Sequence, residues 1–139
     1  MNPTDRQRGP RAAQTVILLA LVALVALGVV MWSNVTGEWR MRDEHDVRRT
    51  NAEHDVVVFV AEWCGYCKRL QAWLDASGVP HRVLDVEKSE AASYGQEAVV
   101  GRYAGVPTTV IGTDVYQGLR TDELRARLTQ AGYTMRGDP

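Results

Sequence analysis

The most pronounced pattern in the chain is a long apolar run, residues 15–32, which no charged residue interrupts. In a helix that rises ~1.5 Å per residue the run spans about 27 Å, close to the thickness of a bilayer's hydrocarbon core. A helix that is apolar on every face needs a large protein to bury it, and a chain of 139 residues supplies at most one domain. The run therefore predicts a transmembrane signal anchor after a polar N-terminal tail, residues 1–14. The alternative is a signal peptide that is cleaved after Ala26-Leu27-Gly28.

A polar, highly charged stretch follows the anchor, and its lack of a sustained apolar period predicts a linker over residues 33–54. Arginines flank both sides of the anchor, so counting them does not decide its orientation. Arg11 lies just before the run, whereas the nearest charge after it, Glu38, is acidic. This difference favours a single-pass protein of the inner (cytoplasmic) membrane, with its C-terminal domain on the periplasmic, extracytoplasmic side.

From residue 55 onward, short β-branched runs alternate with segments rich in helix formers. A right-handed crossover makes the first two strands parallel, and Gly112-Thr113-Asp114 predicts a hairpin between the last two. Ser89 and Thr121 are the predicted N-caps of two helices. The pattern predicts an α/β domain over residues 55–133 in the order β-α-β-α-β-β-α, with a four-stranded mixed sheet flanked by helices. The predicted strands are 55–61, 81–86, 108–111 and 115–117, and the predicted helices are 66–76, 89–102 and 122–131.

Composition narrows the function by exclusion. The net charge of −1 and the pI of about 6.3 give no basic field that attracts nucleic acid. A disulfide-stapled fold needs more than two cysteines, spread along the chain, and a structural zinc site usually needs four ligands. The three histidines, His45, His54 and His81, are not spaced as ligand partners of the cysteine pair. We therefore expect no nucleic-acid partner and no metal site.

The two cysteines, Cys64 and Cys67, fall where a buried strand is predicted to end and a helix to begin. Backbone N–H groups and the helix dipole at such a terminus lower a thiol's pKa, and the thiolate is the form that attacks disulfides. Cys67 lies one helical turn further on, within reach of Cys64. We expect Cys64 to be the exposed nucleophile and Cys67 the resolving thiol of a thiol–disulfide oxidoreductase, with the redox-active disulfide in place of any cofactor.

Other interpretations of the pair stay open. One is a binding or assembly module that captures a metal or a partner thiol, such as a copper- or haem-delivery helper, and another is a disulfide isomerase. An inert bridge is disfavoured because so short a loop adds little loop-closure stabilisation. Pro107, taken alone, reads as an ordinary loop proline, and most X–Pro bonds are trans.

Two segments together resemble the thioredoxin superfamily over about residues 55–131. They are Trp63-Cys-Gly-Tyr-Cys67, which is similar to the active-site run of that superfamily, and Gly105-Val-Pro-Thr108, which is similar to its cis-proline loop. The resemblance implies a thioredoxin-like fold with a cis Val106–Pro107 bond, and a substrate that pairs with the backbone of Val106. Trp63, Tyr66, Val106 and Pro107 are then the candidate substrate-binding residues.

Within the superfamily, the departures favour a glutaredoxin-like (glutaredoxin/mycoredoxin-type) redoxin with an N-terminal membrane anchor. Val58 stands where thioredoxins carry a buried aspartate, and the linker has no pattern for their extra N-terminal strand and helix. Glutaredoxins usually carry a lysine where this chain has Ala61, and a glycine pair where it has Gln117-Gly118, so the use of glutathione stays open. Arg120 is an alternative ligand for a carboxylate.

The partners implied are protein disulfides or dithiols, or a low-molecular-weight thiol. A reductase or a membrane redox partner would exchange electrons with the pair. The lipid bilayer is contacted through residues 15–32, and the protein is expected to be a monomer.

Overall fold

The structure is a computed structural model that describes residues 10–52, 55–102 and 104–136. Part of the predicted N-terminal tail, residues 1–9, and two predicted linker residues, Glu53 and His54, lie outside the described residues. The chain divides into two compact units, and the boundary in the sequence falls between Trp39 and Arg40. The boundaries predicted for tail, anchor, linker and domain stay predictions.

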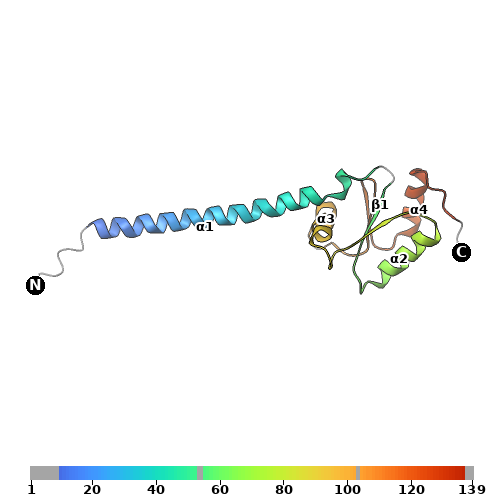
Figure 1. Ribbon diagram of the computed structural model, residues 1–139, viewed down its shortest axis with the longest axis horizontal. Coiled ribbons are helices and arrows are strands. Elements are labelled where there is room, and N and C mark those ends of the chain that lie inside the picture. The colour runs from blue at the N-terminus through green and yellow to red at the C-terminus, as the bar shows by residue number, and fades with distance from the viewer. Residues whose placement is uncertain (1–9, 53–54, 103, 137–139) are drawn as a thin grey trace, which may run out of the picture. The chain divides into compact units, whose positions relative to one another are not determined.

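Helix α1, Pro10–His45, contains the apolar run (Figure 1). Every large apolar side chain between Val16 and Trp39 is exposed, and the helix is long and apolar enough to cross a membrane. The helix extends beyond residue 33, where the polar pattern predicted a linker, and ends only at His45. This part of the helix is polar and therefore shows no apolar period, but most of residues 38–45 are compatible with a helix. The positive charges of Arg42 and His45 also suit the negative end of the helix dipole.

The central strand of the sheet is β1, Val56–Val60, whose five residues are all buried. It pairs in parallel with β2, Arg82–Asp85, and antiparallel with β3, Thr108–Ile111. Strand β4, Asp114–Gln117, closes the hairpin with β3 and gives the order β2-β1-β3-β4. This strand order confirms the predicted four-stranded mixed sheet. The β-branched run of β1 is buried on both faces, as expected of an interior strand.

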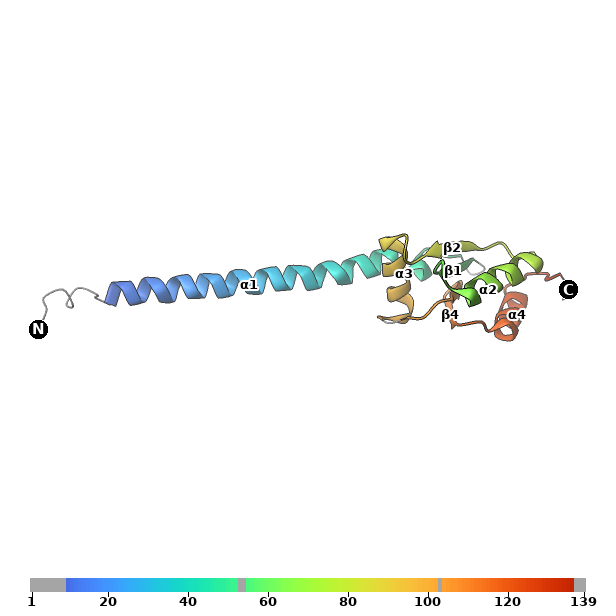
Figure 2. The same cartoon turned by 90° about the horizontal axis from the view of Figure 1, so that it is seen from below.

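Helices cover both faces of this sheet. Figure 1 shows α2, Gly65–Ala76, and α4, Thr121–Gln130, on one side of β1 and α3, Glu90–Val100, on the other. The packing follows the alternation of side chains along β1. One face buries Val56, Val58 and Val60 with Leu70, Leu74, Leu124 and Leu128 from α2 and α4, while the opposite face buries Val57 and Phe59 with Val47, Val110 and Val99. Figure 2 shows the same layers from below.

The two predicted N-caps have different outcomes. Ser89 caps α3 as predicted, because its side chain accepts a hydrogen bond from the N–H of Ala92. The prediction for Thr121 is wrong: Arg120 occupies the N-cap position of α4, and its side chain makes no cap hydrogen bond. The Arg120 carbonyl accepts the first helical bond from the N–H of Leu124, so the helix begins one residue earlier than a hydroxyl cap at Thr121 would set it.

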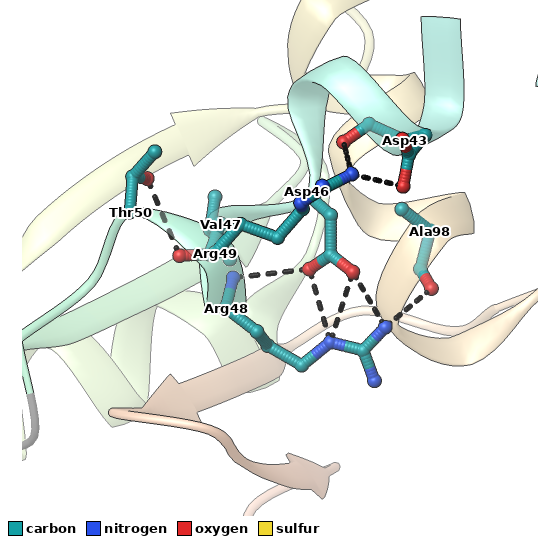
Figure 3. A network of polar contacts seen from close by, with 7 residues as sticks. All are labelled: Asp43, Asp46, Val47, Arg48, Arg49, Thr50 and Ala98. Atoms are coloured by element: carbon teal, nitrogen blue, oxygen red, sulfur yellow. Dashed lines mark hydrogen bonds and ion pairs between the residues drawn. The ribbon is translucent and has the colours of Figure 1, made fainter. Parts of the chain in front are cut away.

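A polar network holds the segment between α1 and β1 against α3 (Figure 3). Asp46 caps the 3-10 helix η2, Val47–Arg49, by accepting the N–H of Arg48. The Arg48 guanidinium returns to both carboxylate oxygens of Asp46 and also donates to the carbonyl of Ala98 on α3, at 2.9 Å. This bidentate contact lowers the pKa of Asp46. The segment is therefore a packed part of the second unit.

Candidate active site

The cysteine pair lies at the N-terminus of α2, directly after the loop that leaves β1. Cys64 is the N-cap residue, with an extended backbone, and its Sγ accepts a hydrogen bond from the N–H of Cys67 at 3.1 Å. The two residues form a disulfide, and their Cα atoms are 5.2 Å apart. The expectation that a backbone N–H at the helix terminus points at the Cys64 sulfur is confirmed. This contact, together with the helix dipole, favours negative charge at Cys64 when the disulfide is opened.

Both sulfurs are covered in this disulfide form. Cys64 is 3% exposed and Cys67 is not exposed at all, so the expectation of an exposed Cys64 is wrong here. The reason is packing: both cysteines belong to the apolar cluster that contains Val60 and Leu70, and Val106 packs against this cluster from another loop. Of the two cysteines, only Cys64 keeps any exposed surface.

Two aromatic side chains flank the pair on the outside. Trp63 and Tyr66 are 71% and 57% exposed, although each has a polar or charged contact. The Trp63 Nε1–H donates to the carboxylate of Glu87 at 2.8 Å. The Arg69 guanidinium lies 4.4 Å from the centre of the Tyr66 ring, in a cation–π contact. These contacts orient the two rings while leaving their apolar surface open to a partner.

The turn between β2 and α3 borders the same loop. The Lys88 ammonium lies 2.8 Å from the Glu62 carboxylate and 3.7 Å from that of Asp85. The bond to Lys88 lowers the pKa of Glu62 and raises that of Lys88, but both groups are fully exposed, so the pair contributes little to stability. No role was predicted for the residues of this turn, because a single Glu or Lys before a helix forms no recognisable sequence pattern.

The loop of Val106 and Pro107 reaches the cysteine pair from the side of β3. The Val106–Pro107 bond is cis, as the resemblance implied. Val106 packs on the cluster that holds both cysteines, and the Pro107 carbonyl accepts a hydrogen bond from the N–H of Gly118 at 2.8 Å. Of the four predicted substrate-binding residues, Tyr66 lies in the first turn of α2, Trp63 lies on the loop before it, and Val106 and Pro107 lie on the loop before β3. Their contact with a substrate stays a prediction.

Arg120, the candidate ligand for a substrate carboxylate, forms hydrogen bonds within the protein. The Arg120 guanidinium donates to the Glu123 carboxylate at 2.7 Å and to the Gln117 carbonyl at 3.1 Å. Ala61, which stands where a lysine would be expected, is 3% exposed and offers no charge. Over the residues that the structure describes, no group of three or more His, Cys, Asp or Glu side chains is arranged to hold a metal ion.

Comparison with known proteins points to one family. Residues 56–116 match the family model of glutaredoxins. A candidate glutaredoxin of Mycobacterium tuberculosis is 29% identical over 76 residues, which cover 54% of this chain and 90% of that protein. Monothiol glutaredoxin-S10 of Oryza sativa subsp. japonica is 28% identical over 138 residues, covering 92% of this chain and 80% of the rice protein.

The fold also matches solved structures of glutaredoxins. The buckwheat glutaredoxin–glutathione complex superposes with a TM-score of 0.54 at 22% identity, over 69% of this chain and 94% of that chain. The holo form of glutaredoxin C1 from Populus tremula x tremuloides superposes with the same score at 24% identity, over 73% and 97% of the two chains. At these identities the structural likeness speaks for the fold alone.

Proposed function

We propose that this chain, whose second unit is a glutaredoxin-like domain of the thioredoxin superfamily, is a membrane-anchored thiol–disulfide oxidoreductase. The observation that supports this activity most is the position of Cys64, whose sulfur accepts an N–H at the start of α2 and is bonded to Cys67. A terminus that stabilises a thiolate, beside a second thiol that can resolve the first, is the arrangement that disulfide exchange requires.

The reaction begins from the reduced pair. The Cys64 thiolate attacks one sulfur of a substrate disulfide, forms a mixed disulfide and expels the other substrate sulfur as a thiolate. The Cys67 thiolate then attacks the Cys64 sulfur, which re-forms the Cys64–Cys67 bond and releases the second substrate thiol. Two electrons pass from the pair to the substrate, and the reverse sequence oxidises a dithiol. Cys64 is the residue attacked by partners because Cys67 is completely covered.

We assign substrate docking to the start of α2 with the loop before it, and to the loop before β3. Trp63 and Tyr66 offer exposed aromatic surface, and the cis Pro107 sets the turn that presents Val106. Within the residues that the structure describes, neither the N–H nor the carbonyl of Val106 has a hydrogen-bond partner. An extended substrate segment can satisfy both groups, as strands do when they add to a sheet edge.

The substrates that fit are protein disulfides or a low-molecular-weight disulfide, and a reductase or a membrane redox partner completes the cycle. Helix α1 anchors the protein by a single span, with the redox domain on the extracytoplasmic side. The exposed apolar side chains of α1 support the anchor, and the positions of Arg11 and Glu38 around the span support the orientation. Reporter enzymes fused to the C-terminus, active only inside or only outside the membrane, test this side; activity of the inside reporter contradicts it.

The activity is tested with the full chain in detergent, as wild type, Cys64→Ser and Cys67→Ser. We expect the wild type to reduce insulin, Cys64→Ser to lose turnover, and Cys67→Ser to accumulate a mixed disulfide because no thiol resolves it. If the wild type showed no turnover but bound copper or zinc stoichiometrically, the enzyme proposal would fail and the alternative of a metal-capturing assembly module would be favoured. Rescue of a scrambled disulfide protein by Cys67→Ser would instead indicate an isomerase.

A further inference from the structure

Helix α3 sends a buried amide to the loop that precedes Pro107. Gln96 is only 6% exposed, and its Nε2 donates to the carbonyl of Gly105 at 3.0 Å and to the Oγ1 of Thr108 at 3.3 Å. The Thr108 hydroxyl, which is completely buried, donates to the same Gly105 carbonyl at 2.8 Å. Two donors from different elements thus converge on one carbonyl, and they are bonded to each other.

This arrangement restrains Gly105, which has no side chain that could fix its position by packing. A glycine samples more backbone conformations than any other residue, and nothing lies within 4 Å of the place where a Cβ of Gly105 would be. Side-chain packing therefore does not fix Gly105, whereas the two hydrogen bonds to its carbonyl do. A buried amide and hydroxyl are costly unless they are paired, so each donor favours the loop position that satisfies both.

The restrained carbonyl lies directly before Val106, which packs against the apolar cluster that contains both cysteines. Gln96 reaches the loop from the face of the sheet that α3 covers, whereas Cys64 and Cys67 lie in the cluster on the opposite face. The network touches neither sulfur, and none of its hydrogen bonds involves the backbone of Val106. Its effect on chemistry must act through the position of the loop.

We propose that Gln96 and Thr108 are positioning residues, which hold the Gly105–Val106 segment ready to pair with the backbone of an extended polypeptide substrate. This inference rests on the proposed function and goes beyond it, because it separates two substrate classes. A polypeptide disulfide depends on the network, since its backbone pairs with Val106. A small disulfide without a peptide backbone does not depend on it, since it needs only access to Cys64.

The test uses two neighbouring threonines of β3 and the glutamine. Thr108→Val and Gln96→Met each remove a donor at nearly constant volume. Thr109→Val is the matched control: Thr109 is equally buried, but its hydroxyl has no hydrogen-bond partner among the described residues. Thr108→Ser retains the hydroxyl and serves as the conservative rescue. All variants are made in the full chain and compared after their unfolding midpoints have been recorded.

Pre-reduced protein is mixed with insulin or with bis(2-hydroxyethyl) disulfide, and the second-order rate constant of its oxidation is measured. We expect Thr108→Val and Gln96→Met to lower the rate constant for insulin roughly tenfold, the scale of one lost hydrogen bond. The rate constant for the small disulfide should stay within about twofold of the wild-type value. The reduction potential of the cysteine pair should be unchanged. Thr109→Val and Thr108→Ser behave as wild type with both substrates.

Three results overturn the inference. An unchanged insulin rate in folded Thr108→Val and Gln96→Met shows that the network does not serve docking. Equal losses with both disulfides, or a shifted reduction potential, show that it supports the site in general. A wild type that is oxidised by neither disulfide removes the proposed function and the inference with it, whereas the first two results leave the proposed function in place.

Discussion

Helices α1 and α2 carry leucines in opposite environments. In α1 the leucines of the apolar run are 53–70% exposed and lie all around the helix. In α2 the apolar residues Cys67, Leu70 and Leu74 form one stripe, and all three are completely buried. The same residue type therefore serves two purposes. In α2 it builds a protein core, and in α1 it stays exposed within the described part of the chain.

We therefore expect the buried side chains of α2 to stabilise the fold and the exposed apolar side chains of α1 to determine where the protein is located. Burial of the α2 stripe against Val58 and Val60 is part of what folds the redox domain and seats Cys64 at the helix terminus. The apolar surface of α1 stays unburied within the described protein and makes a bilayer favourable. Substitutions in the two helices should then change different measurements.

The largest effect is expected from Leu74→Ala in α2. Removing a completely buried leucine side chain costs the lost transfer free energy and leaves a cavity, typically about 2–5 kcal/mol. The measurement is urea unfolding of the full chain in detergent, followed by a signal from the redox domain. The matched control is Leu24→Ala in α1, which should leave that transition unchanged because Leu24 is 66% exposed. Equal destabilisation by both variants would contradict the separation of the two helices.

The next effect concerns location rather than folding. Leu24→Arg places a charge near the middle of the apolar run, which costs about 2.5–3.5 kcal/mol at the centre of a spanning helix. We expect the variant to be released from membranes by alkaline carbonate, whereas the wild type stays in the pellet. The unfolding transition of its redox domain should match that of the wild type. A wild type that is itself released by carbonate would refute the anchor.

How far the sequence alone predicts this molecule depends on the range of the interactions. The strand predicted over 55–61 and the cysteine pair at its end were recognisable because local periodicity and spacing determine them. The extension of α1 to His45 could not be predicted in this way, because the polar end of the helix is held by contacts with residues far away in the sequence. One of these is the Arg42–Glu97 ion pair, whose partners lie far apart in the chain.

The same limit applies within the site. Gln96 has no distinguishing local pattern, and its importance rests on a loop that the fold brings to it from β3. The burial of Cys64 likewise follows from a cluster whose residues come from several elements, with Val106 packed against it from the loop before β3. The wrong N-cap at Thr121 shows a smaller limit. A hydroxyl before acidic residues suits a cap, but the neighbouring Arg120 takes that position.

A third, smaller effect is expected at the polar end of the segment that follows α1. Asp46→Asn weakens the contact with Arg48, so we expect a loss of about 1 kcal/mol at pH 7, within the range for a partly exposed hydrogen bond to a charged group. Because Arg48 lowers the pKa of Asp46 in the folded protein, the stabilisation is present above the ordinary value of 3.8 and is lost as the pH falls through the lowered pKa. The free energies of unfolding of wild type and variant should therefore converge below about pH 3.8. A gap that stays constant into acid would show that ionisation of Asp46 is not involved.

The smallest effect is expected three residues earlier, at Asp43→Asn. Asp43 forms an ion pair with Arg49, but both side chains are well exposed, at 72% and 58%, whereas the Asp46 side chain is only 14% exposed. Solvent and salt screen an exposed pair, so the free energy of unfolding should change by less than about 0.5 kcal/mol and the change should vanish in 1 M salt. The same substitution at neighbouring positions thus isolates burial as the variable, in charged residues as Leu74 and Leu24 do in apolar ones. If Asp43→Asn were as destabilising as Asp46→Asn, the number of ion pairs rather than their burial would hold this segment to the redox domain.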